Sequence, residues 1–196
     1  MRLIAIALIL AVLVTPATAQ FGNSAGVDPA SPQSAPGVPA RHHANTQDKI
    51  FAQLAAAGGI AEVELGKLAE HKAESSGVKE FASRMVQDHT RANEQLTQLA
   101  KQAQIPLPTG PGPDHKLLKT ELEKIGGRNF DLTYMQGQVV DHQKTVILLQ
   151  YEIGQGQEGE LQKFASDTLP IVLAHLERAR SLVEELTLLA HNVSTK

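Results

Sequence analysis

Residues 132–153 of this 196-residue chain read LTYMQGQVVDHQKTVILLQYEI, and this stretch decides the fold. Apolar side chains recur there in steps of three and four, which places them on one face of an α-helix. His142 is the one polar member of the row, and a helix that buries the row must bury its imidazole as well. An unpaired buried polar group costs about 1–3 kcal/mol, so we expect other helices to supply a partner. The row is Leu132, Met135, Val139, His142, Val146, Leu149 and Ile153.

The same spacing predicts three more long helices, each with an apolar row that can face a common core. Residues 75–77 and the glycine-rich residues 154–159 predict the turns within two helical hairpins. The second and third helices are joined by a long connection that is rich in proline and then predicts a short helix at 114–125. The fold class is therefore an all-α four-helix bundle, and this connection is long enough to cross the length of the bundle. The four helices are predicted at residues 46–73, 78–103, 128–153 and 160–190.

The two halves of the chain resemble weak repeats of one another. KEFAS at 79–83 matches QKFAS at 162–166, and each segment opens the second helix of a predicted hairpin. Each is also followed by a histidine in the apolar row, His89 in the first half and His175 in the second.

The N-terminus predicts export. Arg2, the apolar residues 3–14 and the sequence Ala17-Thr18-Ala19 are the three parts of a signal peptide covering residues 1–19. The apolar run is shorter than the roughly 20 residues that a membrane-spanning helix needs. Residues 20–44 are rich in Pro, Gly and Ser, which predicts a disordered tether. We expect the folded domain to span residues 45–191 and a short tail to follow at 192–196. We expect an exported protein of the periplasm or cell envelope, without a transmembrane segment once the signal is cleaved.

Composition excludes several classes of site. The chain has no cysteine, which excludes disulfides and thiolate metal sites. A net charge of −3, the absence of tryptophan and the lack of a basic stripe argue against a nucleic-acid partner. The sequence leaves protein partners and a homo-oligomer open.

Four chemically active side chains fall near the midpoints of the four long helices. Midpoints lie at similar height in any four-helix bundle, so these side chains can converge on one polar layer of the core. Imidazole and carboxylate groups there suit Zn, Cu or Fe, and bundle cores commonly hold such sites. Asp88 and Asp141 each precede one of the histidines, and they can orient the histidines or replace a ligand. The predicted metal ligands are Glu62, His89, His142 and His175.

A purely structural interpretation stays open. A Glu/Asp–His hydrogen-bond network across the core can be fully satisfied and can fix the register of the helices. The protein would then be a non-catalytic interaction or structural module of the envelope. Met85, one turn before His89, can supply a thioether to copper or simply fill the core. No nucleophile–base arrangement or phosphate-binding loop stands out, so no enzymatic activity is predicted.

Several segments in combination resemble one family: 61–69 (AEVELGKLA), 81–89 (FASRMVQDH), 130–135 (FDLTYM), 142–144 (HQK) and 168–176 (TLPIVLAHL). They are similar to the exported bacterial proteins of the domain of unknown function 4142, which are labelled outer-membrane or periplasmic proteins. The resemblance implies a ferritin-like bundle but supplies no established activity. The predicted metal ligands themselves suggest a role in metal handling or stress protection in the envelope. Ferritin-like di-iron sites use Glu-x-x-His, whereas Val86 and Val172 stand three residues before His89 and His175. Ferroxidase activity is therefore not carried over.

Overall fold

The computed structural model describes residues 44–194, with side chains through residue 188, and this part of the chain is helical and contains no strand. The predicted signal peptide (1–19) and nearly all of the predicted tether (20–44) lie outside the described residues. Each helix begins and ends close to its predicted bounds, and the last one continues into the predicted tail. The helices are α1 (Thr46–Lys72), α2 (Ser76–Gln102), α3 (Pro113–Lys124), α4 (Gly127–Gln155) and α5 (Gly159–Ser194).

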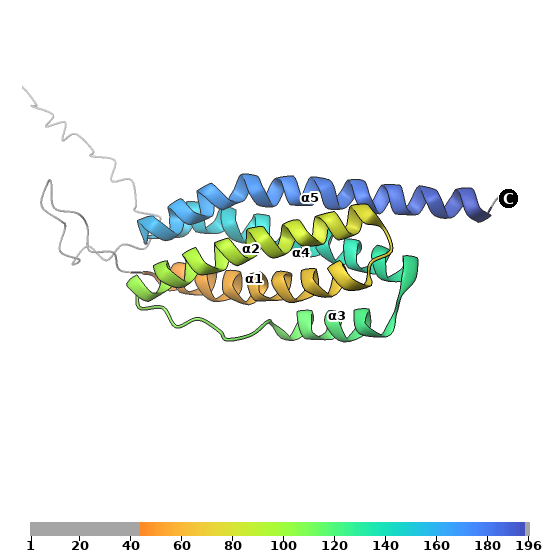
Figure 1. The fold of residues 1–196 in the computed structure, drawn as a ribbon. Helices are drawn as coiled ribbons and strands as arrows, with labels where there is room; N and C mark the ends of the chain where they lie inside the picture. Colours follow the sequence, from red (N-terminus) through yellow and green to blue (C-terminus); the bar gives the residue numbers. More distant parts are fainter. Residues whose placement is uncertain (1–43, 195–196) are drawn as a thin grey trace, which may run out of the picture.

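The four long helices form a bundle of two antiparallel hairpins, α1–α2 and α4–α5 (Figure 1). Helix α1 also packs on α4, and α2 packs on α5. The connection from α2 to α4 runs back along the bundle and carries α3, which packs on α1 and α4. Lys72 Nζ holds α3 by donating to the carbonyl oxygens of Leu122 (3.0 Å) and Glu123 (2.8 Å). The predicted all-α bundle with a short helix in a long connection is confirmed.

Two buried aspartates tie each hairpin to the turn of the other. Asp131, near the start of α4, accepts from the backbone N–H groups of Glu74 (3.1 Å) and Ser75 (2.7 Å) in the α1–α2 turn. Asp48, in the first turn of α1, accepts from two backbone N–H groups of the α4–α5 turn at 3.0 and 3.1 Å. These bonds satisfy backbone donors at helix starts and fix how far each hairpin is shifted along the other.

The repeat seen in the sequence is also a repeat of structure. Asp48 and Asp131 are 83 positions apart, and so are Phe81 and Phe164, which are buried near the starts of α2 and α5. The two hairpins therefore use the same residues at the same places to build their ends.

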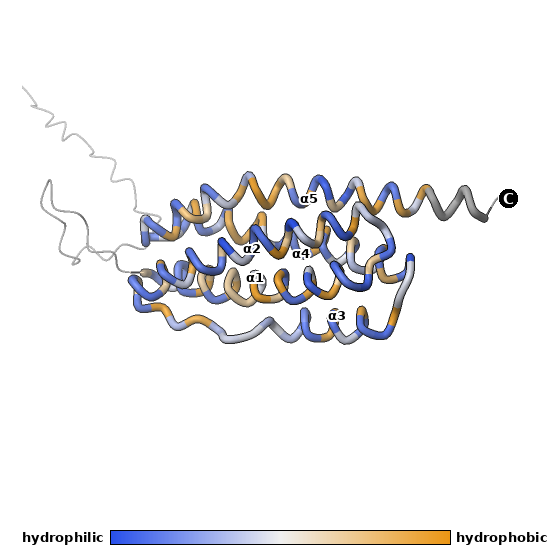
Figure 2. The backbone as a smooth tube through the Cα atoms, viewed as in Figure 1, coloured by the Kyte–Doolittle hydropathy of each residue, from blue (hydrophilic) through white to orange (hydrophobic). Residues whose placement is uncertain are grey.

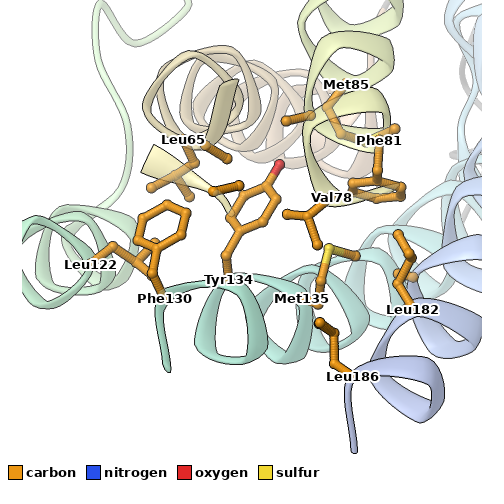
Figure 3. Packing of buried hydrophobic residues seen from close by; sticks show 14 residues of the cluster. Leu65, Val78, Phe81, Met85, Leu122, Phe130, Tyr134, Met135, Leu182 and Leu186 are labelled. Atoms are coloured by element: carbon orange, nitrogen blue, oxygen red, sulfur yellow. The ribbon is translucent and has the colours of Figure 1, made fainter. Parts of the chain in front are cut away.

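A polar layer divides the core into two hydrophobic clusters. Hydrophobic and hydrophilic residues alternate along every helix (Figure 2), as expected of amphipathic helices around a core. Figure 3 shows the first cluster, in which Leu65, Met85, Tyr134 and Leu182 come from four helices. The second contains Phe51, Leu96, Leu149, Phe164 and Val172 among others. Between the clusters lies the polar layer, which we define as Glu62, Asp88, His89, Gln138, His142 and His175.

The buried face of α4 is rotated from the predicted row. Met135, His142 and Leu149 are buried as predicted, whereas the other four members of the row are only half-buried. Asp131, Gln138 and Glu152 are fully buried in their place. The rotation follows from the position of α4, which packs against both α1 and α5, so that the most buried direction lies between those neighbours.

Two glycines of α1 have opposite surroundings. A Cβ at Gly66 would lie 2.8 Å from Val86 Cγ2 and 3.1 Å from the carbonyl oxygen of Ala82, so α2 packs directly against the α1 backbone there. A Cβ at Gly58 would meet no atom within 4 Å. Close packing of α2 therefore requires a glycine at position 66. Gly58 lowers the stability of the helix and permits no close contact in exchange.

We predict opposite signs for the two alanine substitutions. Gly58→Ala should raise the free energy of unfolding by roughly 0.5–1 kcal/mol, because alanine has the higher helix propensity. Gly66→Ala should lower it by about 1–2 kcal/mol, because the clash with α2 outweighs that gain. Urea unfolding followed by circular dichroism measures both, and a shift of the same sign in the two variants would contradict the packing described.

Candidate metal centre

Three histidines from three helices meet in the polar layer. His89 of α2, His142 of α4 and His175 of α5 each place one ring nitrogen within 4.8 Å of the other two. Their ring centroids are 5.5 to 5.8 Å apart. The prediction that these helices bring their histidines to one level therefore agrees with the geometry. We call these three side chains the histidine cluster.

Hydrogen bonds fix the orientation of two rings. His142 Nδ1 lies 2.9 Å from the carbonyl oxygen of Gln138, which can only accept, so Nδ1 carries the proton and Nε2 keeps its lone pair. His175 Nε2 lies 3.0 Å from Asp88 Oδ2, which leaves the lone pair of this ring on Nδ1. Carbonyl and carboxylate partners of this kind typically hold metal-binding histidines.

Each ring of the cluster retains one buried nitrogen without a hydrogen-bond partner. These atoms are His89 Nε2, His142 Nε2 and His175 Nδ1. An unpaired buried group costs about 1–3 kcal/mol, so three in one cluster form an expensive arrangement for a structural core. A metal ion is the partner that can accept three nitrogen lone pairs at once.

The cluster fits an ion in protonation state and in size. Burial lowers the pKa of all three imidazoles, that of His89 to about 3, so the rings are neutral at physiological pH. Nitrogens at 2.0–2.1 Å from one ion would lie about 3.3–3.6 Å apart. The cluster is somewhat wider at up to 4.8 Å, and small ring rotations close the difference.

Asp88 is held between charged groups. Arg84 and Arg91, one turn on either side along α2, both donate to its carboxylate, and His175 contacts it from α5. Burial alone would raise its pKa, but the hydrogen bonds from Arg84, His175 and Arg91 hold the pKa below the usual range. Asp88 thus stays ionised and orients His175.

Glu62 lies in the polar layer but outside the histidine cluster. Its Oε2 accepts from Gln138 Nε2 at 2.8 Å, and its Oε1 lies 3.9 Å from His142 Nδ1, the nitrogen that points away from the cluster. Burial raises the pKa of Glu62 to about 7. The structure therefore brings all four predicted ligands to one layer and only the three histidines to one point.

Asp141 also lies away from the cluster. It pairs with His115 (Nε2 to Oδ2, 3.3 Å) of α3 and with Lys144 (Nζ to Oδ1, 3.7 Å) on its own helix. The hydrogen bond from His115 to Asp141 raises the pKa of that histidine. No contact between Asp141 and His142 supports the predicted role of Asp141 as a partner of that histidine. The contacts of Asp141 instead tie the α2–α4 connection to α4.

A cavity of about 460 Å³ reaches the polar layer from the outside. Its wall includes Gly58, Glu62, His89 and Asp141, while Leu54 and other exposed apolar side chains of α1 and α4 line its mouth. The space left by the missing side chain of Gly58 belongs to this cavity. The cavity provides a route by which an ion can approach His89.

Two members of the site carried no signal in the sequence. Gln138 joins Glu62 and His142 through its side chain and its carbonyl, yet it lies off the predicted apolar row. Phe81 lies under the cluster, with its ring centroid 6.4 Å from that of His142 and 6.5 Å from that of His175. The sequence marks Phe81 only as a core residue.

Comparison with known proteins places the chain beside uncharacterised families. A family model described as domain of unknown function (DUF4142) matches residues 33–182. No curated protein is significantly similar in sequence.

Solved structures share the fold. A DUF305 fragment from Deinococcus radiodurans has a TM-score of 0.66 at 11% identity, covering 73% of this chain and 99% of that one. A DUF305 protein from Streptomyces coelicolor, described as secreted, has a TM-score of 0.63 at 13% identity, covering 72% and 92%. CopM in its Cu(II)-bound form has a TM-score of 0.60 at 17% identity, covering 70% and 96%. CopM in a Cu(I)-bound form is similar too, with a TM-score of 0.61 at 16% identity over the same shares.

We predict that Glu62 makes stability fall as pH rises. The folded state keeps the proton of Glu62 up to a pKa of about 7, whereas the unfolded chain releases it near the ordinary glutamate pKa of 4.5. The free energy of unfolding should therefore decrease between pH 4.5 and pH 7, by at most about 3 kcal/mol from this residue. In Glu62→Gln this decrease should be absent, so that the metal-free variant is more stable than the wild type at pH 8.

Chemical unfolding in chelator at several pH values measures this dependence. Glu64→Gln is the matched control, because Glu64 is half-exposed on the same helix and pairs with Lys119. Parallel pH curves for the wild type and Glu62→Gln would contradict the prediction.

Proposed function

The chain belongs to the DUF4142 family, whose description assigns no function, and we propose from its geometry that the protein binds one transition-metal ion. The ion is held by the histidine cluster, and the role is metal handling in the cell envelope. Zinc, copper and iron are the ions to test.

The single observation that carries the proposal is the unpaired nitrogen on each ring of the cluster. The structural interpretation of the polar layer requires a satisfied hydrogen-bond network, in which every buried nitrogen has a partner. Within the layer, Glu62 Oε2, His142 Nδ1 and Asp88 have partners, whereas Gln138 Oε1 and the three ring nitrogens, which alone converge on one point, have none. That pattern favours an ion over a network.

Residues around the cluster have separate roles in this proposal. Asp88 holds His175, and the carbonyl group of Gln138 holds His142, so that each ring presents its lone pair. Glu62 and Asp141, which the sequence predicted as a ligand and as an alternative ligand, are assigned no bond to the ion.

The similar structures support metal binding and export. Structures of CopM are of Cu(II)-, Ag- and Cu(I)-bound forms, and a bundle of the same fold can therefore hold such ions. A similar DUF305 protein is described as secreted, in agreement with the predicted signal peptide. None of the described helices is long and apolar enough to cross a membrane.

We predict that the untagged protein retains one metal ion per chain. His142→Ala should lose it, because two imidazoles remain where three are needed. His71→Ala is the matched control, since His71 is exposed in the last turn of α1, and it should keep the ion. Elemental analysis of the purified proteins, after exposure to Zn, Cu or Fe and desalting, gives the stoichiometry. Equal metal content in both variants, or none in the wild type, would exclude the cluster as the site.

A second prediction concerns Asp88. Asp88→Asn should weaken metal binding about 10–100-fold without abolishing it, because loss of a carboxylate partner lets the ring of a ligand rotate. Asp167→Asn, which removes an exposed carboxylate paired with Lys163 on α5, should leave the affinity unchanged. Competition with a chelator of known affinity measures both, and equal affinities for the two variants would remove Asp88 from the proposal.

A further inference from the structure

We propose that the histidine cluster selects monovalent copper, with silver as its analogue, over divalent ions. This inference rests on the proposed function and names the ion. Three properties of the cluster carry it: the number of donors, the charge around them and their closure from water.

The cluster offers three nitrogen donors. Among residues 44–188, whose side chains the structure describes, no carboxylate joins the three rings within bonding range of a common ion. Zinc in structural sites is four-coordinate and tetrahedral, and Cu(II) prefers a tetragonal arrangement of nitrogen and oxygen ligands. Cu(I) and Ag(I) have filled d shells and accept two or three donors. Three imidazoles therefore complete the coordination of a monovalent ion and leave a divalent ion short of ligands.

The charge around the cluster does not compensate a divalent ion. Asp88 already accepts from Arg84 and Arg91, so these three side chains together bring no negative charge. Glu62 faces the protonated nitrogen of His142 and accepts from Gln138. The solvation penalty of a buried ion rises with the square of its charge, so a divalent ion here would pay about four times the penalty of a monovalent one.

The cluster is closed to the water that could complete a divalent shell. The three free nitrogens are buried, and the Phe81 ring covers His142 and His175 from the first hydrophobic cluster. On the opposite side the cavity wall includes His89 and Glu62 but neither His142 nor His175. Water in the cavity therefore reaches the edge of the cluster and not its centre.

The test compares ions on the metal-free, untagged protein without residues 1–19, under anaerobic conditions. Cu(I), buffered with bicinchoninate, should bind one ion per chain and resist a hundredfold excess of Zn(II), and Ag(I) should displace it. X-ray absorption at the copper edge should report three nitrogen neighbours. The protein should bind Cu(I) at least a hundredfold more tightly than Cu(II), which shifts the copper couple relative to aqueous copper. At 59 mV per tenfold, this raises the reduction potential by about 118 mV.

A variant that adds a carboxylate should reverse the preference. Val172 is buried one turn before His175 and lines the cavity. Val172→Glu should improve Zn(II) binding at least tenfold relative to Cu(I), whereas Val172→Gln, of the same size and without charge, should keep the preference for Cu(I). If Val172→Glu does not fold, the competition on the wild-type protein decides alone.

The outcomes separate this inference from the proposed function. Zn(II) that displaces Cu(I) at equal concentration, and is lost in His142→Ala, would support a metal site and overturn the selection of Cu(I). Copper that binds as Cu(II) and stays visible in electron paramagnetic resonance with excess ascorbate would do the same. If no ion is retained, both proposals are overturned.

Discussion

Three imidazole nitrogens without partners, facing one another inside an apolar bundle, are the constraint on which the rest of the structure depends. Placing them there interrupts the apolar rows of α2, α4 and α5 at the same height. The core consequently exists as two clusters, one on each side of the polar layer. A stable bundle of this size would gain from filling the layer with Leu or Val, so the layer is retained at a cost in stability.

Rings from different helices can face one another only if the helices keep their register. The buried aspartates supply that register, since Asp48 binds the α4–α5 turn and Asp131 binds the α1–α2 turn. The two sets of bonds lie at opposite ends of the bundle, and a slip of one hairpin by a turn would break both. The internal repeat thus builds the two ends alike, while the centre, where the two halves differ, carries the histidine cluster.

The sequence predicts the bundle well because apolar periodicity depends on the helix alone. It also predicts the layer, because midpoints of packed helices lie at one height whatever their direction. It cannot predict which residues of the layer touch, since contact depends on the rotation of each helix about its axis. The neighbours of α4 set that rotation, which buries Gln138 and turns Glu62 toward it instead of toward the free face of His142. The pairing of Asp88 with His175 joins residues 87 positions apart and has no local signal.

The same helix rotations also explain why the layer combines a closed cluster with an accessible edge. Gly66 lets α2 approach α1 next to the first cluster, whereas on the other side of Glu62 the missing side chain of Gly58 leaves space that widens into the cavity. The cavity ends at His89, the least buried ring of the three, so an ion arriving by that route meets one imidazole before the other two. In the proposed metal site, this asymmetry places His89 next to the cavity and the other two rings away from its water.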